Sequence, residues 1–231
     1  MAKYMIHACP KRMWYIEEYF LPSMLKQGIN EEDITIYNDV NRDGNLESCL
    51  KSFESVPNDG EGTWHLQDDL ILASNFKKQS EKYDYGIVYG FTGYYDKDKN
   101  GWLPPGIVKP KQMWSSFQCV RIPNYIALKF AAWFRQYMSR NYVYRKVVDT
   151  GKCDDWFFKT YLQSELKDID ILNLAPNIVD HVDRLIGGSV INGLREEPLY
   201  RARFWEEEEL YEQLAKDLGV EIPVYKGDNN G

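Results

Sequence analysis

The sequence lacks the features of a membrane-embedded or disulfide-linked protein. No apolar run is long enough to span a bilayer. Residues 1–7 lack the long apolar core of a signal peptide. The four cysteines lie far apart and form no paired-ligand motif. Reduced thiols in a cytoplasmic compartment are the simplest interpretation, so we expect a cytoplasmic protein that makes no contact with a membrane.

Several common enzyme motifs are also missing. There is no phosphate-binding loop of the nucleotide triphosphatases, no dinucleotide glycine fingerprint and no nucleophile elbow. Residues 39–44 and 96–101 match the first half of a calcium-binding EF-hand loop. The twelfth position of that loop requires Glu, but it holds Leu50 in one case and Ile107 in the other. Both stretches are better interpreted as Asx and Gly turns.

The composition indicates a globular protein with an acidic balance. The 231 residues are 44% hydrophobic and 27% charged, enough for one substantial core. The formal net charge of -7 opposes capture by a nucleic-acid backbone, so a nucleic-acid partner is disfavoured. The net charge does not exclude a local basic groove that binds one. Aromatic residues make up 15%, and such side chains line sugar and base pockets as well as cores.

Strand and helix patterns alternate along the chain. Apolar runs predict strands at residues 4–8, 33–39, 62–69, 84–91, 114–122 and 169–174. Helical spacing predicts helices at residues 13–25 with a bend at Pro22, at 46–53, after Pro123 and from Asp154. This order favours a parallel sheet covered by helices on both faces. We expect a catalytic domain over residues 1–200, followed at 201–231 by an amphipathic helix and a tail.

A pair of acids ends the third predicted strand. Trp64 and Leu66 alternate with polar residues, and the strand then stops at Asp68 and Asp69, with helical spacing resuming at once. The carboxyl ends of parallel strands form the edge at which such sheets bind ligands. Adjacent carboxylates repel each other and favour a shared cation with oxygen ligands, such as Mg²⁺ or Mn²⁺. The alternative is that one of the acids only caps the next helix.

Two further polar sites follow in the chain. Asp154 and Asp155 open a predicted helix, and His181 follows the late strand at 169–174. An acid at a helix start is often only a cap, and a single histidine is often structural. The order of the three sites nevertheless resembles the nucleotide-sugar glycosyltransferases of the GT-A fold over roughly residues 3–192.

The resemblance implies a fold and an activity. The fold would be α/β and GT-A-like: a Rossmann-like, mostly parallel central sheet flanked by helices, here with a C-terminal helical extension. The activity would be that of a metal-dependent glycosyltransferase of the hexosyltransferase type. It would move a sugar from a nucleotide-sugar donor, preferably a UDP-sugar, to a hydroxyl on a glycan, a protein or a modified base, with inversion of the anomeric centre.

The resemblance also assigns roles to single residues. Asp69 would ligate Mn²⁺ or Mg²⁺, with Asp68 and His181 completing the metal site. Asp155 would be the catalytic base and Asp154 the neighbour that caps the helix. The family pattern usually begins with an acid where Gln67 stands here.

The donor nucleotide would lie along the first strand ends. The predicted donor-binding residues there are Ala8, Pro10, Arg12, Asn38, Asp39 and Asp68. Acceptor contacts are expected from the aromatic loop at residues 94–102.

Two other functions remain open at this point. A nucleotidyltransferase also uses paired carboxylates and a metal, but it usually has a glycine-rich loop after its first strand, and residues 9–12 contain no glycine. A non-catalytic carbohydrate-binding protein would fit the many Trp and Tyr residues, but it would not need an acidic pair near Asp155.

Overall fold

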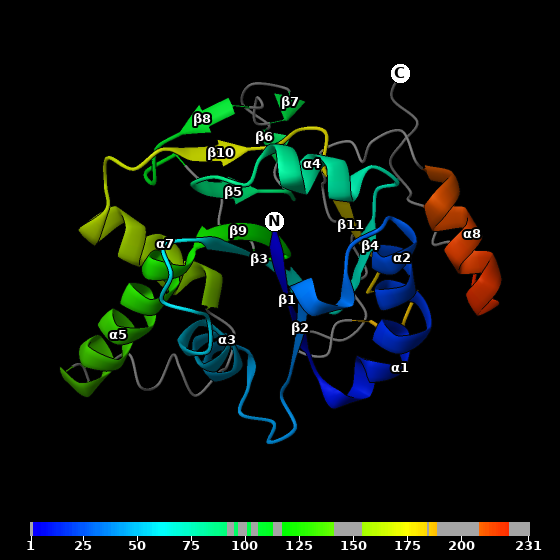
Figure 1. Ribbon diagram of the computed structural model, residues 1–231, viewed down its shortest axis with the longest axis horizontal. Coiled ribbons are helices and arrows are strands. Elements are labelled where there is room, and N and C mark those ends of the chain that lie inside the picture. The colour runs from blue at the N-terminus through cyan, green and yellow to red at the C-terminus, as the bar shows by residue number, and fades with distance from the viewer. Residues whose placement is uncertain are drawn as a thin grey trace.

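A seven-stranded sheet forms the centre of the structure, with strand order β2-β1-β3-β9-β5-β10-β8 (Figure 1). This computed structural model describes residues 2–91, 95–96, 101–102, 106–112, 117–140, 154–183, 185–188 and 208–221. The strands of the sheet are β1 (Lys3–Ala8), β2 (Ile34–Asn38), β3 (Gly62–Gln67), β5 (Ile87–Tyr89), β8 (Gly106–Val108), β9 (Cys119–Pro123) and β10 (Ile171–Asn173).

Most strands of this sheet run in one direction. β1 is parallel to β2 and β3, and β10 is parallel to β5. β9 lies antiparallel between β3 and β5, and β8 is antiparallel to β10 at the edge. The predicted mostly parallel sheet is therefore confirmed, with the reversed strand β9 at its centre.

Smaller strands and helices complete the described structure. The short strands are β4 (Leu70–Leu72), β11 (Val179–His181), β6 (Tyr95–Asp96) and β7 (Gly101–Trp102). The helices are α1 (Met13–Tyr15), α2 (Leu21–Lys26), α3 (Asn45–Glu54), α4 (Phe76–Lys82), α5 (Asn124–Arg140), α7 (Asp154–Glu165) and α8 (Glu208–Leu218). Short 3₁₀ turns lie at Pro10–Arg12 and Glu31–Asp33, and a π-helical turn at Ile16–Phe20.

The sheet separates two apolar cores. Successive side chains of a strand point to opposite faces, and in β1 the side chains of Tyr4 and Ile6 enter one core while Met5 enters the other. The first core is closed by α1, α2, α4 and α8, and the second by α3, α5 and α7. Figure 1 shows α1, α2 and α8 on one side of the sheet and α3, α5 and α7 on the other. The prediction of helices on both faces is confirmed.

The C-terminal helix packs on the same molecule. Tyr211, Leu214 and Ala215 of α8 are buried in the first core. The predicted amphipathic helix is thus present, with its apolar stripe covered. None of the helices in the described ranges has the length and apolar character needed to cross a membrane.

The helix after β1 contains a π-helical turn. We expected a bend at Pro22, and the chain forms a wider turn at Ile16–Phe20, immediately before α2. Proline has no N–H, so Pro22 cannot donate to the carbonyl of residue 18. The wider turn accommodates this missing bond while Tyr15, Ile16 and Phe20 stay buried.

The expectation that a helix follows Asp68 and Asp69 at once is wrong. The two acids form a turn, and β4 follows them before α4 begins at Phe76. Leu70 and Leu72 are buried on the core side of β4. A strand this short leaves too few residues for a period of two to be recognised.

The expected acceptor loop at 94–102 lies mostly outside the described residues.

Two histidines, the partly buried His7 and the buried His65, form a pair on neighbouring strands. His7 Nε2 lies 2.9 Å from His65 Nδ1, and Ser52 Oγ lies 3.3 Å from His7 Nδ1. The ring of Phe53 packs edge-on against His65, with centroids 4.5 Å apart. Burial lowers the pKa of His7 to about 4, and burial together with the charge of His7 holds the pKa of His65 well below its usual value. Both rings are therefore neutral at pH 7.

We expect acid to destabilise the protein through this pair. Because the folded-state pKa values of His7 and His65 lie below those of the unfolded chain, the unfolded chain binds more protons. Stability therefore falls as the pH drops below about 6.5. At pH 5.5, relative to pH 7.5, His7 should lower the free energy of unfolding by on the order of 1 kcal/mol, and His65 should lower it further.

Urea unfolding at the two pH values measures this loss. His7→Gln should lose less stability than the wild type, by on the order of 1 kcal/mol. Ser52→Ala removes a neighbouring hydroxyl but no titrating group, and it should keep the wild-type pH dependence. Equal losses in the wild type and His7→Gln would show that the histidine pair is not the source.

Candidate functional site

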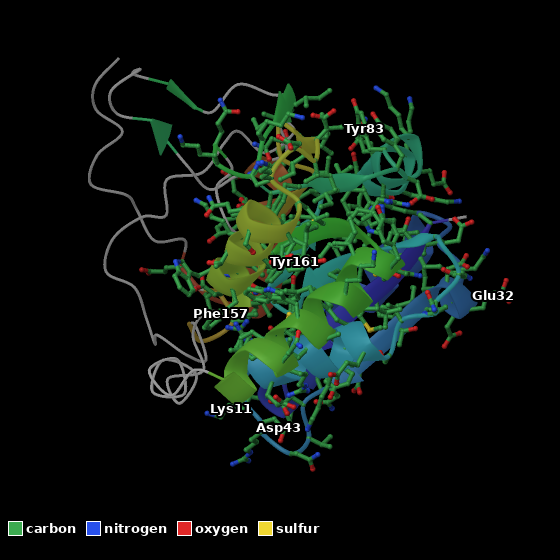
Figure 2. The ribbon with its side chains drawn as sticks, turned by 90° about the vertical axis from the view of Figure 1, so that its left-hand side faces the viewer. Lys11, Glu32, Asp43, Tyr83, Phe157 and Tyr161 are labelled. Carbon is green, nitrogen blue, oxygen red and sulfur yellow. The ribbon has the colours of Figure 1, made fainter. Side chains whose placement is uncertain are left out.

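The predicted donor-binding residues gather at the carboxyl ends of β1, β2 and β3. Ala8 is the register partner of Asn38, and the amide of Asp39 donates to the carbonyl of Ala8 at 2.9 Å. The amide of Cys9 donates to Oδ2 of Asp68 at 2.8 Å. In Figure 2, Lys11 and Asp43 are labelled at this end of the molecule, and Glu32, which precedes β2, lies away from them. The edge is thus built by the parallel strands, as the sequence predicts.

The two residues at the end of β2 differ in their bonding. Asp39 accepts the amides of Asp43 at 2.9 Å and Gly44 at 3.2 Å, so its carboxylate holds the following turn. The side-chain oxygen Oδ1 of Asn38 is buried and has no hydrogen-bond partner among the described residues. A buried carbonyl oxygen of this kind is a candidate acceptor for a ligand hydroxyl or N–H group.

Arg12 connects the turn after β1 to the acidic pair. Pro10 opens a 3₁₀ turn, with the amide of Arg12 donating to the carbonyl of Cys9 at 3.0 Å, and this turn directs the Arg12 side chain inward. Nη1 of Arg12 bonds Oδ1 of Asp68 at 2.9 Å and also bonds Oδ2 of Asp69. Nη2 donates to the carbonyl of Gly188 at 2.7 Å. Arg12 is only 4% exposed.

The small sheet of β4 and β11 brings His181 to the same place. His181 is the register partner of Leu70, and the amide of Val182 donates to the carbonyl of Asp69 at 2.8 Å. His181 Nε2 lies 3.0 Å from Oδ2 of Asp69, and Nδ1 lies 3.0 Å from Oδ1 of Asp183. The three predicted metal ligands, Asp68, Asp69 and His181, therefore meet, although β11 is far from β3 in the sequence.

Charge pairing sets the protonation states of this cluster. Burial raises the pKa of Asp68, and the charge of Asp69 raises it further, against the opposing effect of Arg12. Burial would also raise the pKa of Asp69, but His181 and Arg12 outweigh it and hold that pKa below its usual value. Burial opposes protonation of His181, yet Asp69 and Asp183 raise its pKa to about 10. At neutral pH His181 is an imidazolium ion.

This arrangement is an ion cluster and not a ready-made metal site. Among the residues that the structure describes, no three His, Cys, Asp or Glu side chains are arranged to hold a metal ion. The guanidinium of Arg12 bonds both carboxylates, and a protonated His181 donates hydrogen bonds instead of ligating a metal.

The donor atoms themselves nevertheless fit a divalent cation. Oδ1 of Asp69 is buried and, within the described part of the chain, has no hydrogen-bond partner. Together with Asp68 it offers the carboxylate oxygens that Mg²⁺ and Mn²⁺ prefer. His181 would add a nitrogen ligand only after it loses its proton. A cation would thus find suitable ligands there once Arg12 has withdrawn.

The predicted catalytic base lies on a different part of the fold. α7 begins at Asp154, as predicted, but the side chain of Asp154 lies outside the described part. Oδ1 of Asp155 accepts the amide of Trp156 at 2.7 Å, and burial raises the pKa of Asp155. Burial thus opposes the stabilisation that a helix N-terminus gives to an ionised carboxylate.

α7 is held in the second core. Figure 2 shows Phe157 and Tyr161 along this helix, and both side chains are buried against α5. In Figure 1, α7 lies across the sheet from β4 and β11. Among the described residues, no hydrogen bond or ion pair links Asp155 to the ion cluster. Its catalytic role therefore stays a prediction.

Sequence reasoning missed several members of the ion cluster. Asp183 was not singled out, although it follows His181 by two residues, and its Oδ1 lies 3.0 Å from Nδ1 of that ring. The bond of Arg12 to the two acids was also missed, although a buried acidic pair requires a nearby cation. Tyr15 was not singled out either, and its hydroxyl donates to the carbonyl of Leu70, beside the cluster, at 2.8 Å.

Comparisons with known proteins give only weak likenesses. No family model matches the chain, and no curated protein matches it. One similar solved structure is a Drosophila β-1,4-galactosyltransferase 7 mutant in complex with manganese, UDP-Gal and xylobiose. It is 10% identical, with a TM-score of 0.41 over 78% of this chain and 71% of that chain. Another is HddC from Yersinia pseudotuberculosis, at 11% identity and a TM-score of 0.34 over 75% of this chain and 90% of that chain. Likenesses this weak fix neither family nor activity.

Proposed function

We propose that the protein is a glycosyltransferase of the hexosyltransferase type. It moves a sugar from a nucleotide-sugar donor, preferably a UDP-sugar, to a hydroxyl-bearing acceptor. The observation that carries this proposal is the meeting of Arg12, Asp68, Asp69 and His181 at the carboxyl edge of the parallel strands. The sequence resemblance to GT-A glycosyltransferases expects the acids and the histidine at one site, in this order along the chain.

The donor nucleoside has suitable partners along the same edge. Ala8 ends β1, Pro10 opens the turn that follows it, and Asn38 ends the neighbouring strand β2. Oδ1 of Asn38, which lacks a partner among the described residues, is placed to accept a hydrogen bond from a ribose hydroxyl or a base N–H. Asp39 keeps the adjoining turn in shape through its bonds to the amides of Asp43 and Gly44.

The negative diphosphate of the donor requires positive charge. The proposed site would supply it from the Arg12 side chain and from a divalent cation. Asp69, Asp68 and neutral His181 are the residues that would hold Mn²⁺ or Mg²⁺. When bound, that ion stabilises the negative charge of the departing nucleoside diphosphate as a Lewis acid. The guanidinium of Arg12 is suited to bind phosphate oxygens in a bidentate manner.

Asp155 is the proposed catalytic base, with Asp154 as the helix-capping neighbour. A carboxylate with a raised pKa is a stronger base in its ionised form, and burial raises the pKa of Asp155. It would take the proton of the acceptor hydroxyl while the new bond forms on the face opposite the departing diphosphate. Direct displacement of this kind inverts the anomeric centre.

The proposal also covers the acceptor, the cellular compartment and the domain bounds of the protein. The acceptor is a glycan, a protein or a modified base, and the net charge of -7 disfavours unmodified nucleic acid. Cys9, Cys49 and Cys119 carry thiols and no disulfide, which supports a cytoplasmic setting. Residues 1–200 would form the catalytic domain and residues 201–231 its C-terminal extension.

Sugar transfer and donor hydrolysis test the function directly. The protein should release UDP from at least one UDP-sugar in the presence of Mn²⁺ or Mg²⁺, and a strong chelator should abolish the release. Asp69→Asn should remove the activity because it takes away the central carboxylate. Asp170→Asn, which changes an exposed acid paired with Lys109, is the matched control and should keep it. Full turnover under chelation contradicts the metal assignment, and inactivity with every UDP- and GDP-sugar contradicts the function.

Asp155→Asn tests the catalytic base. The variant keeps the side-chain shape but loses the proton acceptor, so the transfer rate should fall by about 10²–10⁴ while donor affinity persists. Glu165→Gln, at the other end of α7, serves as the control and should transfer normally. The rate is measured with saturating donor, and affinity by calorimetry. Transfer at the wild-type rate by Asp155→Asn would place the base elsewhere.

A further inference from the structure

We infer that Arg12 is a built-in counter-cation that occupies the position of the divalent metal and has to leave it when a metal binds. The inference rests on the proposed function, because it concerns the cation of the same site. It assigns Arg12 two alternating partners, the acidic pair and the donor diphosphate, where the sequence predicted only donor binding.

The contacts of Arg12 carry the inference. Its Nη1 atom bonds Oδ1 of Asp68 and Oδ2 of Asp69, and these oxygens belong to the predicted metal ligands. Arg12 is 4% exposed, so water neutralises little of its charge. A guanidinium held on both acids and a divalent cation on the same acids would lie in contact and repel each other. Occupation by one therefore excludes the other.

The acids are only partly satisfied by Arg12. Oδ1 of Asp69 is buried, and the described residues provide no hydrogen-bond partner for it. Arg12 contributes one positive charge to the two carboxylates and the imidazolium of His181 a second, yet both bond Oδ2 of Asp69 and leave its Oδ1 without a partner. The orphaned oxygen is thus the atom that a metal would satisfy and that Arg12 leaves unpaired.

Departure of Arg12 would also break its bond to the chain near Gly188. Nη2 of Arg12 donates to the carbonyl of Gly188, while the amide of Gly188 donates to the carbonyl of Asp183 at 2.5 Å. Metal entry would remove the first of these ties and leave the second. The backbone of Arg12 would stay in the turn after Cys9, next to Asp68. From there the released guanidinium can bind phosphate oxygens. Metal binding would in this way prepare the site for the donor.

Metal affinity measured without any sugar donor tests the competition. Mn²⁺ is titrated by calorimetry into the wild type, Arg12→Gln and Lys11→Gln. Because the wild type must first displace its own cation, Arg12→Gln should bind Mn²⁺ about tenfold more tightly. Lys11 is the neighbouring residue, exposed and labelled in Figure 2, and its replacement removes the same charge without touching the acids. Lys11→Gln should change the affinity by no more than about twofold.

Thermal unfolding of the same proteins guards against a folding defect. Arg12→Gln should unfold at a lower temperature than the wild type in chelator, and Mn²⁺ should raise its midpoint by more than it raises that of the wild type. If Arg12→Gln does not fold, Arg12→Lys replaces it. Lysine keeps one charge but loses the planar guanidinium that bonds Asp68, Asp69 and the carbonyl of Gly188 together, so tighter Mn²⁺ binding than in the wild type is again expected.

The outcomes separate this inference from the proposed function. Unchanged, weaker or undetectable Mn²⁺ binding in the Arg12 variant overturns the inference. If the wild type nevertheless transfers sugar, the proposed function stands without it. Tighter binding in the Arg12 variant supports the inference, and it does so even if the wild type transfers no sugar, a result that would overturn the function alone.

Discussion

Two adjacent carboxylates buried at the end of β3 impose the strongest constraint on this protein. Asp68 and Asp69 are 8% and 6% exposed, and neither charge can be left without compensation. Removing one partner of a buried ion pair typically costs about 3–5 kcal/mol. An exposed pair such as Lys109 with Asp170 contributes about 0–1 kcal/mol. The buried acids therefore decide which segments have to meet.

The segments that meet there come from distant parts of the chain. Arg12 arrives from the 3₁₀ turn after β1, and His181 arrives on β11 through its pairing with β4. The hydroxyl of Tyr15 on α1 fixes β4 by bonding the carbonyl of Leu70. The first apolar core beneath these elements supplies the packing, while the charges select one arrangement of the turns above it. The need to compensate the two buried carboxylates thus creates the candidate ligand site at this edge of the sheet.

Local patterns predicted the parts of the fold that depend on neighbouring residues. The strands around β1, β2 and β3, the helices α3 and α8, and the acids at the end of β3 follow from periodicity and turn chemistry. The direction of β9 does not, because Cys119–Pro123 is buried on both faces and reads the same in either direction. β4 was missed because Leu70–Leu72 is too short to show a period.

Side-chain partners were the other limit of sequence reasoning. The meeting of Asp69 with His181 was predicted through a resemblance, not through spacing, because a contact between distant segments leaves no local pattern. The contact of Arg12 with both acids was not foreseen for the same reason. The His7–His65 pair depends on the register of β1 against β3, which follows only from the assembled sheet.

A crystal structure with a UDP-sugar and Mn²⁺ is the most direct test of this account. We expect the diphosphate to lie at the ends of β1, β2 and β3, with the metal on Asp68 and Asp69. The Arg12 guanidinium should have turned from the acids toward the phosphates. A donor bound away from this edge, with the contacts of Arg12 to Asp68 and Asp69 intact, would contradict it.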